Sequence, residues 1–217
     1  MAKGHVTITV LLTTLVTALL ATNNPVLGPA AAAAQTIVDR WASVPAPPPV
    51  LKPVTADPKT TALLMLDLMT QNCGKRPACV ASLPVMKKLL ADARAAKVPV
   101  IYSIIANSTT ADVMPDVAPL PDEPWVQSGP DKFLNTDLAK ILKDKGVQTV
   151  IVTGTSSNGA VLFTGAGAAF RGMNVIVPVD GMSAVEPYAD LSTAYTFLNA
   201  PSVSAKSTLT KIDMIKF

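Results

Sequence analysis

The residue types that could do chemistry are few, and they stand where predicted strands end. A carboxylate at such a place can transfer a proton, and serine or asparagine can bind a polar group of a ligand. Four strand ends carry candidates: Asp67, residues 103–107, the turn 154–158 and Asp180. Asp67 is the strongest of them, because a carboxylate at the end of an apolar strand is costly to bury without a partner. We expect Asp67 either to serve in a site or to order the strand end as part of a buried ion pair or a helix cap.

The turn Ser156, Ser157 and Asn158 precedes a predicted helix that starts at about Gly159. Its backbone N–H groups could bind an anion or an oxyanion. The same residue types are preferred as helix N-caps, so both interpretations stay open. We do not expect a serine nucleophile here, because no histidine is available as its base: the only one, His5, lies in the predicted export signal.

The two cysteines, Cys73 and Cys79, enclose a short segment that contains Gly74 and Pro77, which suit a tight ring. In an oxidising compartment such a pair is expected to form a disulfide bond. The alternative is a redox-active or metal-binding pair. It is disfavoured because the spacing is not C-x-x-C and no partner ligands stand nearby.

The elements that must position these residues alternate between strand and helix. Residues 61–66 form a continuous apolar run, which is typical of a strand buried on both faces. Ser82 is a plausible N-cap and Pro84 suits the first turn of a helix over 84–96. The pattern predicts a parallel sheet with helices on both faces, and ligands bind beyond the carboxyl ends of such strands. The remaining strands are expected at 99–105, 149–153, 175–177 and near 207–209, and the helices at 136–145, 159–171 and 187–198. A long loop, 106–131, contains Trp125, which with Tyr102 could line a pocket or pack in the core.

The first residues predict an export signal. Lys3 precedes an apolar run, and the alanine-rich stretch that ends at Ala34 supplies small residues for cleavage. The alternative is a retained membrane anchor, but the run is shorter than the roughly 20 residues that span a bilayer. We therefore predict a signal peptide at 1–34, a proline-rich strap at 35–58 and an α/β domain at 59–217. The mature protein is expected to be periplasmic or secreted, from a bacterium, with no stable membrane anchor.

Composition excludes several function classes. The 217 residues carry 18 basic and 15 acidic side chains without a basic run, so nucleic-acid binding is not expected. A single histidine argues against most zinc sites, a Ser-His-Asp triad and a Cys-His pair. We expect no metal and no cofactor.

Several segments, taken in order, resemble landmarks of the isochorismatase-like hydrolases. They are Leu64-Met65-Leu66-Asp67, the stretch 132–138, Thr149 to Gly154, the stretch 168–175, and Val179-Asp180. The resemblance implies a three-layer α/β sandwich with a mostly parallel central sheet, a small-molecule substrate or ligand and a homo-oligomer. Most members of that family hydrolyse amides with an Asp, a Lys and a nucleophilic Cys.

Carried over residue by residue, the family's Asp falls on Asp67 and its Lys on Lys132, which could pair with Asp67. The nucleophile position falls on Ala160, which has no atom that can attack a carbonyl. From its place between strand and helix, the turn of Ser156, Ser157, Asn158 and Gly159 remains our candidate for binding a substrate or an oxyanion.

Two hypotheses follow. The first is an exported hydrolase that acts without a cysteine, with Asp67 as acid or base and Lys132 as its charge partner, holding a charged group of the substrate. The second is a catalytically inactive relative that binds a small ligand or another protein. Retention of Asp67 and Lys132 favours the first hypothesis, and Ala160 favours the second.

Overall fold

The computed structural model describes Met1, Gly4 and residues 36–217. Apart from Met1 and Gly4, the predicted signal peptide lies outside the described residues. The chain divides into two compact units, Met1–Pro45 and Ala46–Phe217. The described part of the first unit contains one 3₁₀ turn, Trp41–Ser43, and buries no residue. The domain boundaries expected at 34/35 and 58/59 stay predictions. Within the described ranges, no helix has the length and apolar character needed to cross a membrane.

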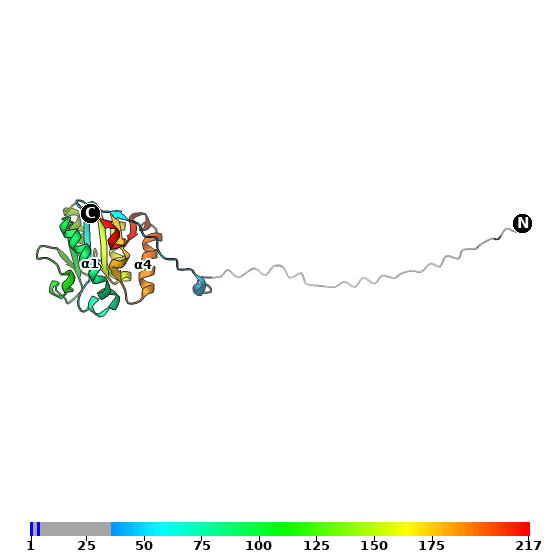
Figure 1. Ribbon diagram of the computed structural model, residues 1–217, viewed down its shortest axis with the longest axis horizontal. Coiled ribbons are helices and arrows are strands. Elements are labelled where there is room, and N and C mark those ends of the chain that lie inside the picture. Colours follow the sequence, from blue (N-terminus) through cyan, green and yellow to red (C-terminus); the bar gives the residue numbers. More distant parts are fainter. Residues whose placement is uncertain (2–3, 5–35) are drawn as a thin grey trace. The chain divides into compact units, whose positions relative to one another are not determined.

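The second unit is built on a parallel sheet (Figure 1). Its strand order is β4-β3-β2-β5-β6-β8, and the short β7 pairs with the end of β5. These strands are β2 (Thr61–Leu66), β3 (Val100–Ile104), β4 (Trp125–Gln127), β5 (Thr149–Thr155), β6 (Asn174–Pro178), β7 (Met182–Ser183) and β8 (Ser207–Thr210). A separate two-stranded pair joins β1 (Val54–Thr55) to β9 (Ile215–Lys216).

The central strand β2 explains why the sheet must be covered on both faces. All six of its residues are buried. Successive side chains of a strand point to opposite faces, so Leu63 and Met65 enter one hydrophobic cluster while Leu64 and Leu66 enter the other. Both clusters need a layer of helices to close them.

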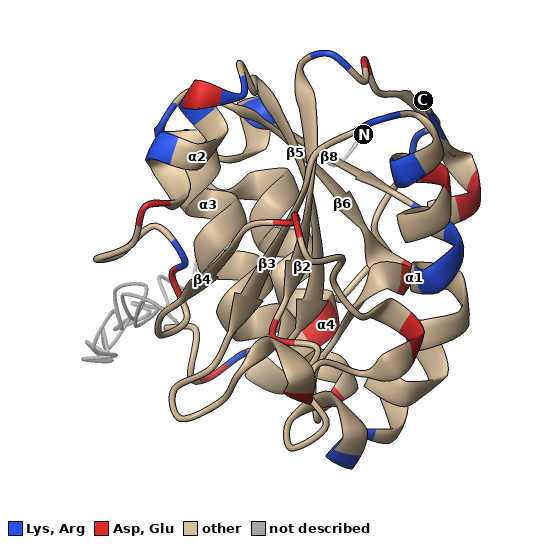
Figure 2. Ribbon diagram, turned by 90° about the vertical axis from the view of Figure 1, so that its left-hand side faces the viewer, with Lys and Arg blue, Asp and Glu red and all other residues tan. Residues whose placement is uncertain are grey.

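Helix α1 (Pro77–Ala95) packs on one face of the sheet, where Met86 and Leu89 join the cluster of Leu63. The opposite face is covered by α2 (Leu138–Asp144), α3 (Leu162–Phe170) and α4 (Pro187–Asn199). Figure 2 shows α1 on one side of the strands and α2 and α3 on the other. Charged residues lie mostly on helices and loops, and the strands carry few of them (Figure 2). The predicted three-layer α/β architecture is confirmed.

One predicted helix start is wrong. Helix α1 begins at Pro77, and Pro84 lies inside it. Proline is well suited to the first helical turn, so Pro77 starts the helix. Pro84 removes only one backbone donor, and the buried stripe of the helix holds the rest in place. Ser82 is therefore not an N-cap, and its hydroxyl donates to the carbonyl of Cys79 at 2.7 Å.

Other elements differ in extent. Strand β4 lies within the segment expected to be a loop, and β5 continues to Thr155. A turn of π-helix, Ser157–Val161, precedes α3. Single 3₁₀ turns occur at Cys73–Lys75, Thr110–Asp112, Pro115–Val117, Val179–Gly181, Ser204–Lys206 and Ile212–Met214.

Candidate functional site

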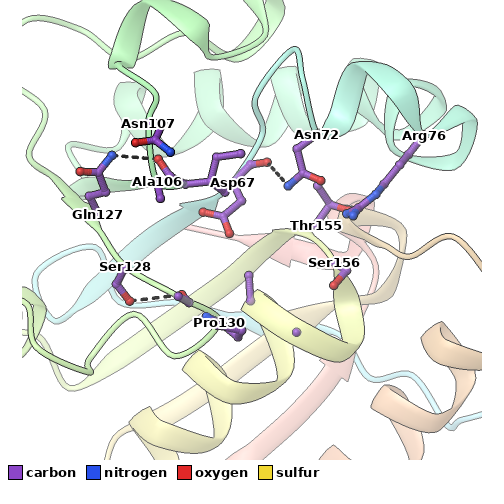
Figure 3. Close-up of a pocket in the computed structure, with 14 residues that line it drawn as sticks. Asp67, Asn72, Arg76, Ala106, Asn107, Gln127, Ser128, Pro130, Thr155 and Ser156 are labelled. Atoms are coloured by element: carbon purple, nitrogen blue, oxygen red, sulfur yellow. Dashed lines mark hydrogen bonds between the residues drawn. The ribbon is translucent and has the colours of Figure 1, made fainter.

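A cavity of about 540 Å³ opens at the carboxyl ends of β2, β3 and β5 (Figure 3). This is the edge at which a parallel α/β sheet presents its ligand sites. The wall is formed by the ends of these strands, by the segment between β2 and α1, by the end of β4 and the segment after it, and by the π-helical turn. Its residues are Asp67, Asn72, Arg76, Ile105, Ala106, Asn107, Gln127, Ser128, Gly129, Pro130, Thr155, Ser156, Gly159 and Ala160.

Asp67 stands in the wall of this cavity at the end of β2. Its backbone is left-handed (φ 54°), which turns the chain sharply out of the sheet. The carboxylate is buried and receives two hydrogen bonds, one on each oxygen. The Ser103 hydroxyl donates to Oδ1 at 2.7 Å, and the Lys132 ammonium donates to Oδ2 at 2.7 Å. These two bonds fix the orientation of the carboxylate, so its remaining lone pairs are aimed consistently.

Lys132 is fully buried and forms the expected ion pair with Asp67. Its Nζ also donates to the Ser128 carbonyl at 3.3 Å, and its backbone N–H donates to Thr164 Oγ1 at 3.2 Å. Lys132 does not line the cavity. The expectation that it holds a charged group of the substrate is therefore not supported, because its ammonium is directed at Asp67 and the protein backbone.

The turn that carries the predicted oxyanion site contributes only in part. Ser156 and Gly159 line the cavity, whereas Ser157 is buried away from it and Asn158 is exposed. The peptide bond between Thr155 and Ser156 is cis. The Gly159 N–H already donates to the Ser156 carbonyl at 3.1 Å. Ser156 occupies the N-cap position of this turn, but its side chain makes no capping hydrogen bond.

Ala160 faces the cavity and is 3% exposed. The position that the family resemblance gives to the nucleophile is therefore part of the same wall as Asp67. It presents a methyl group there, which cannot form a covalent intermediate.

Three further candidates from the sequence, Asp180, Tyr102 and Trp125, do not line this cavity. Asp180 Oδ1 accepts a hydrogen bond from the Ile212 N–H at 2.9 Å, outside the cavity. Burial of Tyr102 raises the pKa of its phenol, whose hydroxyl donates to the Val117 carbonyl at 2.9 Å. Trp125 lines a different cavity, formed with Thr110 and the prolines that follow it.

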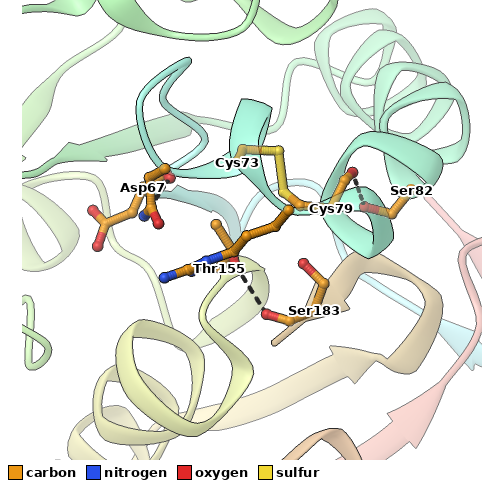
Figure 4. The surroundings of a disulfide bond; sticks show 8 residues. Asp67, Cys73, Cys79, Ser82, Thr155 and Ser183 are labelled. Atoms are coloured by element: carbon orange, nitrogen blue, oxygen red, sulfur yellow. Dashed lines mark hydrogen bonds between the residues drawn. A yellow bond between two sulfur atoms is a disulfide. The ribbon is translucent and has the colours of Figure 1, made fainter. Parts of the chain in front are cut away.

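Sequence reasoning missed Arg76, which lines the cavity on the side opposite Asn107 and Gln127 (Figure 3). Its Nη1 donates to Thr155 Oγ1 at 2.9 Å. Arg76 lies inside the ring closed by the Cys73–Cys79 disulfide, which is confirmed with a Cα–Cα distance of 5.3 Å (Figure 4). The sequence did contain a signal for Arg76, because it is a cation inside a short disulfide ring that begins six residues after Asp67.

The described part of the chain contains no group of three or more His, Cys, Asp or Glu side chains that could hold a metal ion. The polar groups that line the cavity are instead one carboxylate, one guanidinium, hydroxyls and amides. Such a set can bind and orient an organic molecule and can move a proton at Asp67.

A family model described as an isochorismatase domain matches residues 61–206. No protein of curated function shows significant sequence similarity to the chain. Among solved structures, a cysteine hydrolase from Pseudomonas syringae pv. phaseolicola 1448A is 23% identical, with a TM-score of 0.64 over 77% of this chain and 94% of that one.

Two other solved structures are similar. The N-carbamoylsarcosine amidase from Thermoplasma acidophilum is 20% identical, with a TM-score of 0.61 over 71% of this chain and 97% of that one. The nicotinamidase from Staphylococcus aureus is 16% identical, with a TM-score of 0.60 over 65% of this chain and 94% of that one. At these identities the likeness shows a shared fold.

Proposed function

The chain belongs to the isochorismatase-domain family, and from that premise we propose that it is an exported hydrolase of a small molecule that acts without a cysteine nucleophile. In this proposal Asp67 transfers the proton, and Lys132 is a positioning residue that acts through Asp67. The cavity at the ends of β2, β3 and β5 holds the substrate.

The observation that carries the proposal is the buried pair of Asp67 and Lys132 beside a cavity large enough for a small molecule. Burying two charges is costly, and replacing such a pair by apolar residues is often neutral or stabilising. A purely structural need would thus be met more cheaply by apolar side chains. Retention of the pair at a cavity wall favours a role in chemistry.

The chemistry that fits this geometry is direct attack by water. Each oxygen of Asp67 uses one lone pair for Ser103 or Lys132, which leaves capacity to accept a hydrogen bond from a water in the cavity. Asp67 takes a proton from that water while the water oxygen bonds to the carbonyl carbon of the substrate. Asp67 then gives the same proton to the leaving group as the bond between the carbonyl carbon and the leaving group breaks. One water is consumed, and the carboxylate of Asp67 is regenerated.

The type of substrate and the cellular location of the protein rest on separate observations. Two of the solved structures similar to this chain are named as amidases, which favours an amide as the bond that is hydrolysed. The disulfide between Cys73 and Cys79 is typical of proteins in oxidising compartments and supports export. The predicted signal peptide points the same way.

A second candidate function is ligand binding without turnover. Ala160 favours it, because the wall position implied for the nucleophile carries only a methyl group. In that case the Asp67–Lys132 pair would orient a ligand by hydrogen bonding, and the cavity would serve as a binding pocket.

Turnover of a panel of small amides by the purified mature protein tests the proposal. Asp67→Asn should lower kcat by a factor of about 100 or more, because the proton acceptor is lost. Asp122→Asn is the matched control, since Asp122 is exposed and outside the cavity. No turnover of any compound would favour the binding protein, and full activity in Asp67→Asn would remove Asp67 from the mechanism.

A further inference from the structure

Arg76 is the one basic residue in the wall of the cavity. It reaches from the disulfide ring toward Thr155 at the side of the cavity opposite Asn107 and Gln127 (Figure 3). The Thr155 hydroxyl donates to the Ser183 carbonyl at 3.0 Å, so its lone pair is free to accept the bond from Arg76 Nη1. Thr155 thereby holds one edge of the guanidinium and leaves the other donors unused.

The positive charge of Arg76 has no partner within the described residues. The ion pairs found there involve other side chains, and the only side-chain hydrogen bond of Arg76 is the one to Thr155. The other charged residue of the wall, Asp67, is already neutralised by Lys132. The cavity therefore carries a net positive charge, concentrated at one place.

We infer that Arg76 forms an anion subsite and that the ligand of this cavity is a small carboxylic acid. A guanidinium presents its N–H groups as a planar fork that matches a carboxylate in two parallel hydrogen bonds. One uncompensated charge matches a singly charged group better than a phosphate, and the cavity wall also includes the apolar residues Ile105, Pro130 and Ala160. The part of the inference that concerns a substrate rests on the proposed hydrolase, whereas the binding preference does not.

The disulfide ring is what places Arg76. Within it, the Arg76 N–H donates to the Cys73 carbonyl at 2.9 Å, and the Arg76 carbonyl accepts from the Val80 N–H at 3.0 Å in the first turn of α1. The Cys73–Cys79 bond closes this arrangement, so the backbone of Arg76 is held from both sides. Because the segment around Arg76 is already ordered, an anion that binds to the guanidinium does not have to offset the loss of conformational entropy of that segment.

Calorimetric titration with benzoate and with acetophenone tests the subsite, since the two probes have similar shape, differ in charge and have no bond to hydrolyse. The wild-type protein should prefer benzoate, and Arg76→Gln should weaken benzoate binding by about tenfold or more while leaving acetophenone binding unchanged. Arg76→Lys should recover part of the preference, because it keeps the charge and loses the fork. Lys75→Gln makes the same change of charge on an exposed neighbour in the ring and should alter the affinity less than about twofold.

Several results would overturn the inference: no binding of benzoate, equal binding of the two probes, an equal effect of Lys75→Gln, or tighter binding of inorganic phosphate than of benzoate. A thermal melt of each variant shows whether it is folded. These experiments measure binding and not turnover. If the protein prefers benzoate but hydrolyses no compound, the anion subsite is supported and only the proposed hydrolase activity is refuted.

The double variant Cys73→Ala/Cys79→Ala tests the role of the ring. It keeps Arg76 and Thr155, so benzoate binding should weaken by a factor of about 3, less than in Arg76→Gln. Unchanged affinity in a folded double variant would show that the ring does not position Arg76.

Discussion

At the scale of single residues, Asp67 concentrates several demands in one position. It ends a buried strand, adopts a left-handed backbone and carries a charge that is almost out of reach of solvent. The left-handed backbone and the buried charge are each unfavourable alone. They are compatible because Ser103 and Lys132 satisfy both carboxylate oxygens. The side chain is thus held in one orientation, which a proton-transferring group requires.

Removing Lys132 should reveal how unfavourable the buried charge of Asp67 is without its cationic partner. Lys132→Met leaves a buried carboxylate with a single hydrogen bond, and we expect a loss of about 3–5 kcal/mol in the free energy of unfolding. Urea denaturation followed by circular dichroism measures it. Lys88→Met is the control, because it removes an exposed i,i+4 pair with Asp92 that is worth at most about 0.5 kcal/mol.

The double variant Asp67→Asn/Lys132→Met should regain most of the lost stability, since no charge is then left unpaired and asparagine tolerates the left-handed backbone of this position. Equal destabilisation by Lys132→Met and Lys88→Met would mean that the buried pair contributes no more than a surface pair.

At the scale of elements, the close approach of β2 and β5 sets the geometry of the site edge. Gly154 lies opposite Leu66 in the parallel ladder and has φ 127°, and a Cβ built on it would stand 2.0 Å from the Leu66 carbonyl oxygen. Only glycine can occupy this place without moving the residue that precedes Asp67. The spacing of the two strands is therefore part of the placement of the carboxylate.

Gly154→Ala should consequently lower the free energy of unfolding by about 3 kcal/mol or more, from backbone overlap added to a disfavoured φ. Gly146→Ala provides the comparison, because Gly146 also has a positive φ (67°) but nothing lies within 4 Å of its added Cβ. That variant should lose only about 1 kcal/mol. Similar melting temperatures for the two variants would contradict the steric account.

Elements with continuous or periodic apolar patterns were the predictable ones. The strand at 61–66 was placed to the residue, because six consecutive buried positions leave little choice of structure. The start of α1 was missed because Pro77 and Pro84 both satisfy the rule for a first turn, and sequence alone does not rank them. Strand β4 has only three residues and lies inside a proline-rich segment, so its own sequence carries no strand pattern. Its hydrogen bonds to β3 are what hold it in the extended conformation.

The site was predictable to a similar degree. Asp67 follows from its place after a buried strand. Its pairing with Lys132, 65 positions later, has no local signature, and the family resemblance suggested it. The ring around Arg76 could be drawn from the two cysteines, but whether it faces the cavity depends on how α1 packs on the sheet.

At the scale of the whole molecule, the second compact unit uses its N-terminal segment as structure. The Lys52 N–H donates to the Leu209 carbonyl at 2.9 Å, and the Ala56 N–H donates to the Lys216 carbonyl at 2.8 Å. Between them, β1 pairs with β9 near the C-terminus, and Ala56 is buried. Residues 36–45, by contrast, are all exposed.

Two truncations should therefore behave differently. A chain that starts at Ala46 should match the stability of one that starts at Thr36 to within about 0.5 kcal/mol, because it loses no buried residue. A chain that starts at Asp57 lacks β1 and both hydrogen bonds, and it should lose about 2 kcal/mol. Differential scanning calorimetry of the three chains measures this, and a large loss in the first truncation would show that residues 36–45 stabilise the fold.

The complete burial of Lys132 has one more consequence. Every other lysine among the described residues is exposed, so an amine-reactive reagent will modify them all while Lys132 stays unlabelled as long as the site is closed. Acylation of Lys132, followed by mass spectrometry over time, thus reports how often the wall around Asp67 opens. The natural sequence already contains the reporter, and a ligand that occupies the cavity would slow its signal.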